Sequence, residues 1–283
     1  MRWRDLRRSS NVEDRRGSTP RRLIGGGIGS IVVIIILLLA GGGNIGDIFN
    51  VLQPGGGGET TSNYQESAEE NELKNFVSVV LAETEDVWKV IFREKGADYR
   101  MPRLVLYTNS VQSACGISGA ATGPFYCPGD ERVYIDLSFY DDLQKKFSAP
   151  GDFAMAYVIA HEVGHHVQNI MGITDKLASL RSQLSEEDYN QYSIRLELQA
   201  DYFAGVWAHH ADRTKNILEE GDIEEALNAA SAVGDDRIQK RTQGYVVPES
   251  FTHGTSEQRK QWFYKGYRTG DIEQGDTFNA DNL

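Results

Sequence analysis

Two histidines and a glutamate within five residues could build a metal site. His161, Glu162 and His165 lie in the stretch HEVGHH, directly after the apolar run FAMAYVIA. On a helix, side chains four residues apart share one face, so both imidazoles could bind one metal ion. Glu162 would lie about 100° further round, where it could reach a water on that metal without ligating the metal. This spacing is typical of zinc hydrolases; the alternative is a pair of core histidines bonded to carbonyl groups.

A second stretch, IRLELQADYFAGVWAHH, offers the third ligand that such a site needs. Hydrolytic zinc sites usually take three protein ligands and leave one position for water. Glu197 and Asp201 are four residues apart in a stretch that is otherwise apolar all round, which predicts a buried helix. Buried carboxylates need a counter-charge or a metal, and Arg195 lies on another face. We expect Glu197 to bind the metal and Asp201 to accept a histidine N–H bond; a solvated acidic edge is the alternative.

A hydrolytic site also needs a donor for the developing oxyanion. His253, in the stretch FTHGTSEQR, precedes an expected helix N-cap at Thr255 or Ser256 and could project from a fixed loop. We name His253 as the candidate catalytic donor. Tyr245 and Tyr264 are rivals for the role, and a purely structural turn is the remaining alternative.

Helices and strands at set places must position these residues. Apolar residues at helical spacing predict helices over residues 68–95, 153–171, 185–210, 223–232 and 256–267. Residues 103–108 and 132–139 are predicted strands. The second strand alternates apolar and polar residues, which predicts a half-exposed strand in a small sheet that could hold an extended peptide. The whole pattern indicates an α-rich α+β domain over residues 68–283.

Gly164 lies inside the predicted helix that carries the histidines. Glycine costs about 1 kcal/mol relative to alanine in a helix interior. The close approach of another backbone would explain a glycine here, because glycine has no side chain to obstruct such a contact.

Several of these stretches together resemble the YpfJ-like family of bacterial neutral zinc metallopeptidases. They are HEVGHH, ELQAD, CGISGAATGPFYCPGDERVYIDLSFYDDL and THGTSEQR, and the resemblance covers nearly the whole chain. It implies a zincin-like metallopeptidase domain with a small β-sheet and mostly helices, which binds one Zn²⁺ ion. In similar zincins the glutamate of an E-x-x-x-D motif is the third zinc ligand. That position corresponds here to Glu197, with Asp201 at the aspartate position, and no departure from the pattern is visible.

The chain has two cysteines, Cys115 and Cys127, which bracket the stretch GISGAATGPFY. A bridge between them would close a short loop and stabilise the domain by roughly 3 kcal/mol in the chain-entropy model. Disulfides persist in oxidising compartments such as a periplasm or the extracellular space. We predict the disulfide, and two free thiols are the alternative.

The first part of the chain has the composition of a membrane anchor. Residues 23–40 form an apolar run without a charge, close to the length that a transmembrane helix needs. Residues 1–22 contain eight arginines and three carboxylates, a net charge of +5, and the positive-inside rule predicts that they stay cytoplasmic. Residues 41–67 read as a Gly-rich flexible tether. We expect a single-pass protein of the inner (plasma) membrane with a periplasmic or extracellular domain; a cleaved signal peptide is the alternative.

Charge narrows the possible partners. The chain carries a net charge of −12, so residues 41–283 carry −17 once the N-terminal excess of +5 is removed. This argues against a nucleic-acid partner, which needs a basic patch. The leading hypothesis is a membrane-anchored zinc peptidase that acts on a peptide or protein substrate, with Glu162 as general base. A cell-wall peptide amidase and a catalytically silent zincin-like binding scaffold are the alternatives, and the sequence does not indicate an oligomeric state.

Overall fold

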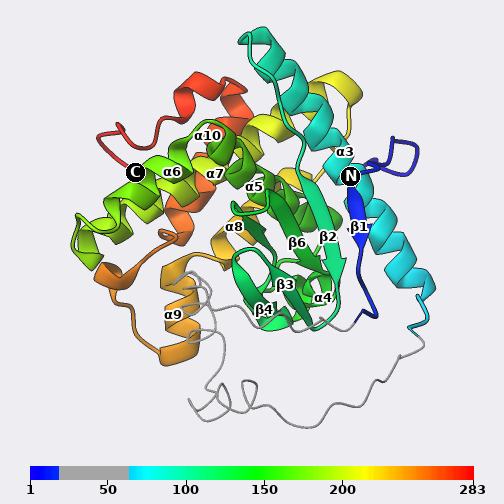
Figure 1. Cartoon of the computed structure of the whole chain (residues 1–283), viewed down its shortest axis with the longest axis horizontal. Helices are drawn as coiled ribbons and strands as arrows, with labels where there is room; N and C mark the ends of the chain where they lie inside the picture. The colour runs from blue at the N-terminus through cyan, green and yellow to red at the C-terminus, as the bar shows by residue number, and fades with distance from the viewer. Residues whose placement is uncertain (19–63) are drawn as a thin grey trace.

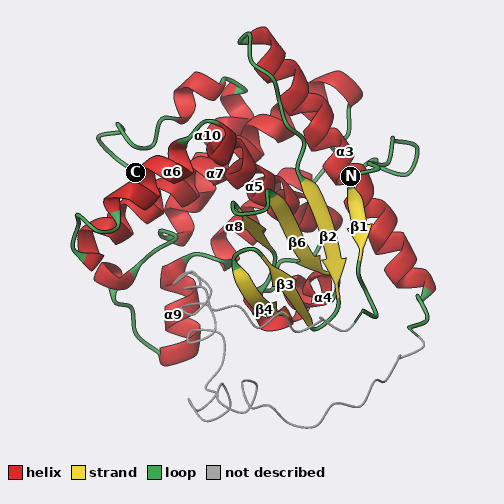
Figure 2. Cartoon of the chain, viewed as in Figure 1, coloured by secondary structure: helices red, strands yellow, loops and turns green. Residues whose placement is uncertain are grey.

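A four-stranded sheet with helices on one face forms the centre of the protein, as Figure 1 and Figure 2 show. The computed structural model describes residues 1–18 and 64–283. The strand order is β1 (Val12–Asp14), β2 (Arg103–Tyr107), β6 (Arg132–Asp136) and β5 (Phe125–Cys127). β1, β2 and β6 are parallel, and β5 runs antiparallel to β6 at the edge. A separate antiparallel pair joins β3 (Ser110–Ser113) and β4 (Gly116–Gly119).

The predicted strand over residues 132–139 forms β6, in the interior of the sheet. Val133 and Ile135 pack on the helical core, whereas Tyr134 on the opposite face joins a second apolar cluster that includes Val111 of β3. The prediction of a half-exposed strand was therefore wrong, because both faces are covered. Both edges of β6 are also paired, with β2 and β5, so β6 cannot hold an extended peptide as we expected.

The helices make up most of the fold, and every helix predicted within residues 64–283 is present. They are α3 (Ala68–Glu94), α4 (Phe139–Lys145), α5 (Asp152–Ile170), α6 (Ile173–Leu180), α7 (Glu186–Lys215), α8 (Asp222–Ala232), α9 (Asp235–Gln243) and α10 (Ser256–Thr269). Short 3-10 turns cover Ala120–Thr122, Pro248–Ser250 and Ile272–Gly275. We did not predict α4, α6 and α9, and α7 continues beyond its predicted end. The architecture is α+β and mostly helical with small sheets, consistent with a zincin-like domain.

Two of the helices begin at reciprocal caps. The Ser67 side chain accepts a hydrogen bond from the Glu70 N–H, and the Glu70 carboxylate accepts one from the Ser67 N–H. Thr255 and Gln258 form the same arrangement at the start of α10. Such caps satisfy N–H groups that the first turn leaves unpaired. At α10 the cap fixes the chain directly after His253.

Helices α5 and α7 cross at Gly164. A Cβ atom added to Gly164 would lie 2.9 Å from the carbonyl oxygen of Ala200 on α7, closer than real Cβ contacts come. The close approach of another backbone, which we predicted for this glycine, is therefore confirmed. The crossing brings the middle of α5 against the part of α7 that carries Glu197 and Asp201.

Residues 1–18 belong to the folded domain. β1 pairs in parallel with β2, and the side chains of Met1 and Trp3 are buried in the core. Figure 1 shows this segment, in blue, beside α3 at the edge of the sheet. The arrangement differs from our expectation that residues 1–22 form a separate basic segment. The physical reason is that arginines of the segment pair with carboxylates of the domain, and a three-residue strand is too short for periodicity to reveal.

The predicted transmembrane anchor over residues 23–40 lies outside the described residues, as does the tether from residue 41 to residue 63. Residues 64–67, the last of the predicted tether, lead into α3. Within the described parts of the chain, no helix has both the length and the apolar character that crossing a bilayer requires.

Candidate metal centre

Three candidate ligands, His161, His165 and Glu197, meet where α5 crosses α7, and we call them the metal centre. Nε2 of His161 lies 3.2 Å from one carboxylate oxygen of Glu197, and Nε2 of His165 lies 3.5 Å from the other. One ligand atom from each residue lies within 4.8 Å of the other two. Zinc–ligand distances of about 2.0–2.1 Å in a tetrahedral site place ligand atoms roughly 3.3 Å apart. The spacing and the donor types therefore fit a zinc ion.

Asp201 orients His161 from the side away from Glu197. Its Oδ1 atom accepts hydrogen bonds from Nδ1 of His161 at 2.8 Å and from the Tyr157 hydroxyl at 2.5 Å. Arg259 donates to both oxygens of Asp201, from Nε at 2.8 Å and from Nη2 at 3.0 Å. Because Nδ1 of His161 is occupied, Nε2 is the nitrogen left for a metal. Asp201 is thus not the unpaired carboxylate that the sequence suggested, since Arg259 supplies its counter-charge.

His165 is oriented by a residue of its own helix. Nδ1 of His165 donates to Oε1 of Gln168 at 2.8 Å. The Gln168 amide in turn donates to the carbonyl oxygen of Leu196 at 2.7 Å and to Oε1 of Gln199 at 3.1 Å, both on α7. This chain of hydrogen bonds leaves Nε2 of His165 facing Glu197 and ties α5 to α7 beside the metal centre.

The electrostatics of the metal centre favour a positive charge. Burial alone would lower the pKa of His161, but the Asp201 and Glu197 carboxylates outweigh it and raise this pKa to about 10. Burial would raise the pKa of Glu197, yet His165 and His253 hold it well below its usual range. A positive charge is therefore favoured between Asp201 and Glu197, and a divalent metal ion would supply one there.

Glu162 follows His161 on α5 and is buried, with 8% of its surface exposed. Its carboxylate makes no hydrogen bond or ion pair within residues 1–18 and 64–283, and neither of its oxygens is fully enclosed there. In contrast to Glu197 and Asp201, this carboxylate is free to bind a water molecule.

His253 is held by Asp235, the first residue of α9. Nδ1 of His253 lies 3.2 Å from Oδ1 of Asp235, and the His253 backbone N–H donates to Oδ2 at 2.6 Å. Burial would lower the pKa of His253, but the Asp235 and Glu197 carboxylates outweigh it and raise the pKa. His253 therefore lies within electrostatic range of the metal centre. The rivals Tyr245 and Tyr264 are 62% and 44% exposed to solvent.

Sequence reasoning missed four polar partners of these residues: Tyr157, Gln168, Asp235 and Arg259. Tyr157 lies four residues before His161, and Gln168 three residues after His165, so helical spacing could have found both. Arg259 lies in the stretch THGTSEQR, but nothing in its spacing links it to Asp201. The contact between Asp235 and His253 likewise depends on how α9 and α10 pack.

The predicted disulfide between Cys115 and Cys127 is present. Next to it on β5, Tyr126 donates a hydrogen bond to Nδ1 of His166 at 3.0 Å, and Nε2 of His166 donates to the carbonyl oxygen of Arg100 at 2.6 Å. His166 therefore has a structural role. It fixes the edge strand β5 against α5, the helix of the metal centre.

Another group of carboxylates meets at the start of α5. Asp152, Asp222 and Glu225 each bring one oxygen within 4.8 Å of the other two. The α-ammonium group of Met1 lies 2.7 Å from Asp152 and 3.4 Å from Asp222. We call these three carboxylates the ammonium pocket, because a cation of the chain itself already lies against them.

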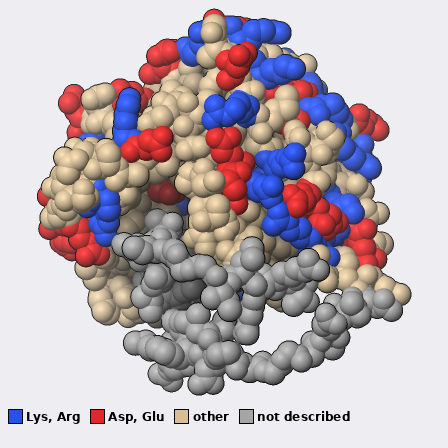
Figure 3. Space-filling view, in the orientation of Figure 1, with Lys and Arg blue, Asp and Glu red and all other residues tan. Residues whose placement is uncertain are grey.

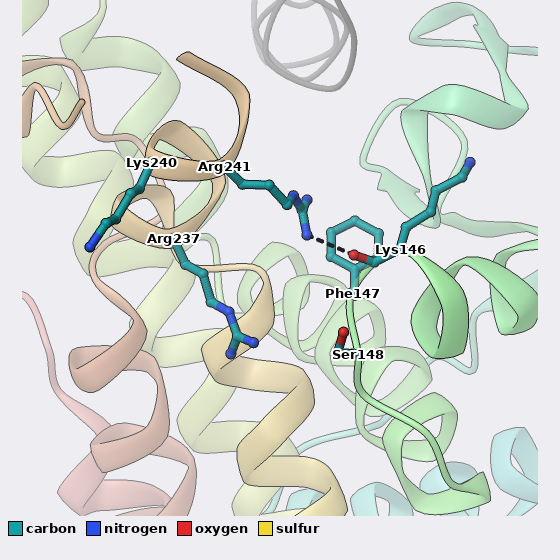
Figure 4. Close-up of a pocket in the computed structure, with 6 residues that line it drawn as sticks. All are labelled: Lys146, Phe147, Ser148, Arg237, Lys240 and Arg241. Carbon is teal, nitrogen blue, oxygen red and sulfur yellow. Dashed lines mark hydrogen bonds between the residues drawn. The ribbon is translucent and has the colours of Figure 1, made fainter. Parts of the chain in front are cut away.

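A hollow of about 260 Å³ lies between α9 and the loop after α4 (Figure 4). Its lining is mostly basic and consists of Lys146, Phe147, Ser148, Arg237, Lys240 and Arg241. Arg241 crosses it and donates a hydrogen bond to the carbonyl oxygen of Lys146 at 2.9 Å. Since no residue of the metal centre is among its lining residues in the described chain, this hollow is a separate feature of the surface.

Comparison with known proteins agrees with this geometry. Residues 1–278 match a family described as "Putative neutral zinc metallopeptidase". The chain is 47% identical over 285 residues to YpfJ of Escherichia coli strain K12, which covers 98% of this chain and 99% of that protein. It is 42% identical over 207 residues to Rv2575 of Mycobacterium tuberculosis strain H37Rv, which covers 70% and 68%. No solved structure shows significant similarity. On the family match and these identities, the chain belongs to this family of neutral zinc metallopeptidases.

Proposed function

We propose that this protein is a zinc-dependent peptidase in which the metal centre holds one zinc ion. The observation that carries the proposal is the spacing of 3.2 and 3.5 Å between the imidazole nitrogens of His161 and His165 and the carboxylate of Glu197. Two imidazoles and a carboxylate are the ligand set of several hydrolytic zinc sites with one open position. Membership of the metallopeptidase family supports the same assignment.

The surrounding residues have the chemistry that peptide hydrolysis requires. A zinc ion bound there would polarise a peptide carbonyl and acidify a water molecule. Glu162, whose carboxylate is free to bind water, would act as the general base: it would accept a proton from the attacking water and return it to the departing amine. Asp201 and Gln168 keep the two imidazoles oriented. His253, held by Asp235, is the donor that we propose for the oxyanion.

The edge strand β5 is the best candidate to bind an extended peptide. It is paired with β6 on one side only among the described strands, so the other edge has main-chain groups to offer. Tyr126 connects β5 to α5 through His166, which keeps the strand beside the metal-bearing helix. We therefore assign to β5 the peptide-binding part that the sequence had suggested for residues 132–139.

We also propose that the apolar run over residues 23–40 attaches the protein to the plasma membrane. The disulfide between Cys115 and Cys127 supports a domain in an oxidising compartment, such as a periplasm or the extracellular space. An attached protein should stay in the membrane fraction after a high-salt wash. Release as a shortened soluble form would instead favour a cleaved signal peptide.

Digestion of casein and of a peptide library, with and without a chelator, tests the peptidase proposal. We expect wild-type protein to cleave peptides, to stop when zinc is removed and to recover when zinc is returned. Glu162→Gln, with zinc still bound, should be nearly inactive because it lacks the base. Cleavage confined to cell-wall peptides would favour the amidase. Zinc-loaded wild-type protein that cleaves no peptide would favour a silent binding scaffold.

A further inference from the structure

The start of the N-terminal segment, residues 1–18, is anchored in the core of the domain. The Trp3 ring is 7% exposed and lies edge-on to Phe76 of α3, with ring centroids 5.4 Å apart. The Arg2 backbone N–H donates to the carbonyl oxygen of Ile217 at 2.8 Å. Together with the Met1 ammonium group in its pocket, these contacts join the segment to α3, to the start of α5, to α8 and to the chain after α7.

Glu85 of α3 binds the middle of the segment. Its carboxylate is buried and accepts hydrogen bonds from the Ser9 hydroxyl at 2.5 Å, the Asn11 amide at 2.8 Å and the Arg7 guanidinium at 2.9 Å. Arg7 also pairs with Asp86 at 2.8 Å. A buried carboxylate would be costly without these partners. The contacts are therefore specific to the residue types of the segment.

The end of the segment adds a strand to the sheet. β1 pairs with β2 over three residues, and the ladder continues beyond them through the Leu104 N–H to the Asn11 carbonyl at 2.9 Å and the Arg15 N–H to the Leu106 carbonyl at 2.8 Å. Arg16, whose side chain is nearly fully buried, then pairs with Glu66 at 2.6 Å, just before α3. The segment thus contacts the folded domain from its first residue to its last turn.

The arginines of the segment are mostly paired, although only Arg16 is buried. Most of them bind acidic groups: Arg4 pairs with Glu72, Arg7 with Glu85 and Asp86, Arg15 with Glu13, and Arg16 with Asp14 and Glu66. Figure 3 shows basic and acidic side chains interspersed on this face, over the region where β1 and β2 lie. The positive-inside rule counts the Lys and Arg residues close to a membrane span. It does not consider whether the segment that carries them is folded into the domain.

We propose that residues 1–18 dock on the domain as an integral strand and lie on the same side of any membrane as the metal centre. A single crossing between residue 18 and residue 64 would put the two parts on opposite sides, and the contacts above could not form. Exchange of the segment with a second copy of the chain would not allow these contacts either, because both copies would cross the membrane in the same orientation. The proposal does not depend on peptidase activity, and it replaces the opposite-sided topology that we expected from the sequence.

Labelling of single cysteines in cells tests the proposal. The only two native cysteines are joined to each other, so an introduced cysteine is the only free thiol. Arg8→Cys marks the segment and Glu187→Cys marks the start of α7; both positions are exposed. Each full-length variant, tagged at its C-terminus, is treated with a membrane-impermeant maleimide before and after the membrane is opened. We expect the two positions to react alike in every condition. Reaction of one while the other stays protected would overturn the proposal.

Trypsin sensitivity of the purified full-length protein tests the docking itself. Glu85→Ala removes three charge-assisted contacts and should raise the rate of cleavage at Arg7 and Arg8 by about tenfold or more. The matched control Glu72→Ala, which loses only an exposed pair with Arg4, should leave that rate within about twofold of wild type. An unchanged rate in Glu85→Ala would contradict the docking.

A second variant is needed because Glu85→Ala changes a residue of α3 and could destabilise that helix. Asn11→Asp places a like charge against Glu85 without changing the helix, so it should release the segment while the rest of the domain stays folded. We expect faster cleavage at Arg7 and Arg8 with little change at sites after α3. Protection equal to that of wild type would again speak against the proposal.

Discussion

Helix α5 contributes to two clusters of possible metal ligands, the ammonium pocket at its start and the metal centre in its second half. Both bring three ligand atoms within 4.8 Å of one another. They differ in donor type, because the ammonium pocket has only carboxylate oxygens whereas the metal centre has two imidazoles. They also differ in what lies against them, since the Met1 ammonium group already contacts the ammonium pocket. Imidazole donors suit zinc, and oxygen-only groups suit harder cations.

The two clusters also differ in how their side chains are held. In the metal centre, each imidazole donates a hydrogen bond from Nδ1 to an acceptor, Asp201 or Gln168, which leaves Nε2 of each ring for a metal. In the ammonium pocket, Asp222 accepts from the Glu219 backbone N–H and Glu225 accepts from the Phe153 backbone N–H. The comparison teaches that spacing alone does not identify a metal site. The donor types and the outer hydrogen bonds separate the two cases.

The largest expected difference between the clusters is in zinc content. Glu197→Ala removes one of three ligands, so we expect bound zinc to fall from about one equivalent per chain to nearly none, with loss of peptide cleavage. Glu225→Ala, the matched change in the ammonium pocket, should leave zinc content at the wild-type level. Metal analysis after gel filtration measures both. If Glu197→Ala kept stoichiometric zinc and normal activity, the third ligand would have to be sought elsewhere, first at His253.

The second prediction separates binding from chemistry within the metal centre. Glu162→Gln should keep zinc, since Glu162 is not a ligand in our assignment, but should lower kcat by about 10²–10⁴-fold because the general base is lost. Glu187→Gln makes the same chemical change at an exposed position of α7 and should leave kcat at the wild-type level. Both are measured with one peptide substrate at saturating zinc. A Glu162→Gln protein with wild-type kcat would remove Glu162 from the mechanism.

A smaller effect is expected from the residue that holds His161. Asp201→Asn should weaken zinc affinity by roughly 10–100-fold, the usual scale for loss of an outer partner of a ligand. Asp152→Asn, which changes the ammonium pocket in the same way, should not alter zinc affinity. Competition with a chromophoric chelator measures the two dissociation constants. Equal effects of the two substitutions would mean that Asp201 acts on overall stability and not on His161.

The smallest expected effect concerns pH and the ammonium pocket. Burial alone would lower the pKa of the Met1 ammonium group, but Asp152 and its neighbours outweigh it and raise this pKa above the usual 8.0. A raised pKa stabilises the fold fully below pH 8, and the stabilisation disappears as pH rises through the raised value. Acetylation of the Met1 amine should therefore lower the free energy of unfolding by about 1 kcal/mol at pH 7.

The gap between acetylated and free-amine protein should close as pH rises above 8. Urea unfolding of both forms across pH 7–10 measures this difference in the free energy of unfolding. Contributions from the other titrating groups cancel when the two forms are compared at the same pH. If the difference in the free energy of unfolding stayed constant with pH, the effect of acetylation would come from the size of the acetyl group and not from the lost charge. Zinc content should be the same in both forms, which keeps this test separate from the metal centre.

Much of this structure follows from patterns within single segments. Helical periodicity located α3, α5, α8 and α10 to within a few residues, and the spacing of His161, His165 and Glu197 indicated a ligand set that the fold does bring together. Partners that depend on tertiary packing were missed. Asp201 seemed to lack a counter-charge because Arg259 comes from α10, which no local spacing connects to α7. β1 was missed because three residues are too few to show a period, and its partner strand is far away in sequence.

The contact between Gly164 and Ala200 sets how closely α5 and α7 approach each other beside the metal centre. A methyl group at residue 164 would have to move about half an ångström from the Ala200 carbonyl to reach ordinary van der Waals distance, and the stiff helices would share that displacement. His165 is the next residue along α5, and Glu197 is three residues before Ala200 on α7. The separation of ligands on different helices therefore depends on residue 164, a position that offers no ligand atom. A side chain there would push α5 and α7 apart and widen the distance between His165 and Glu197.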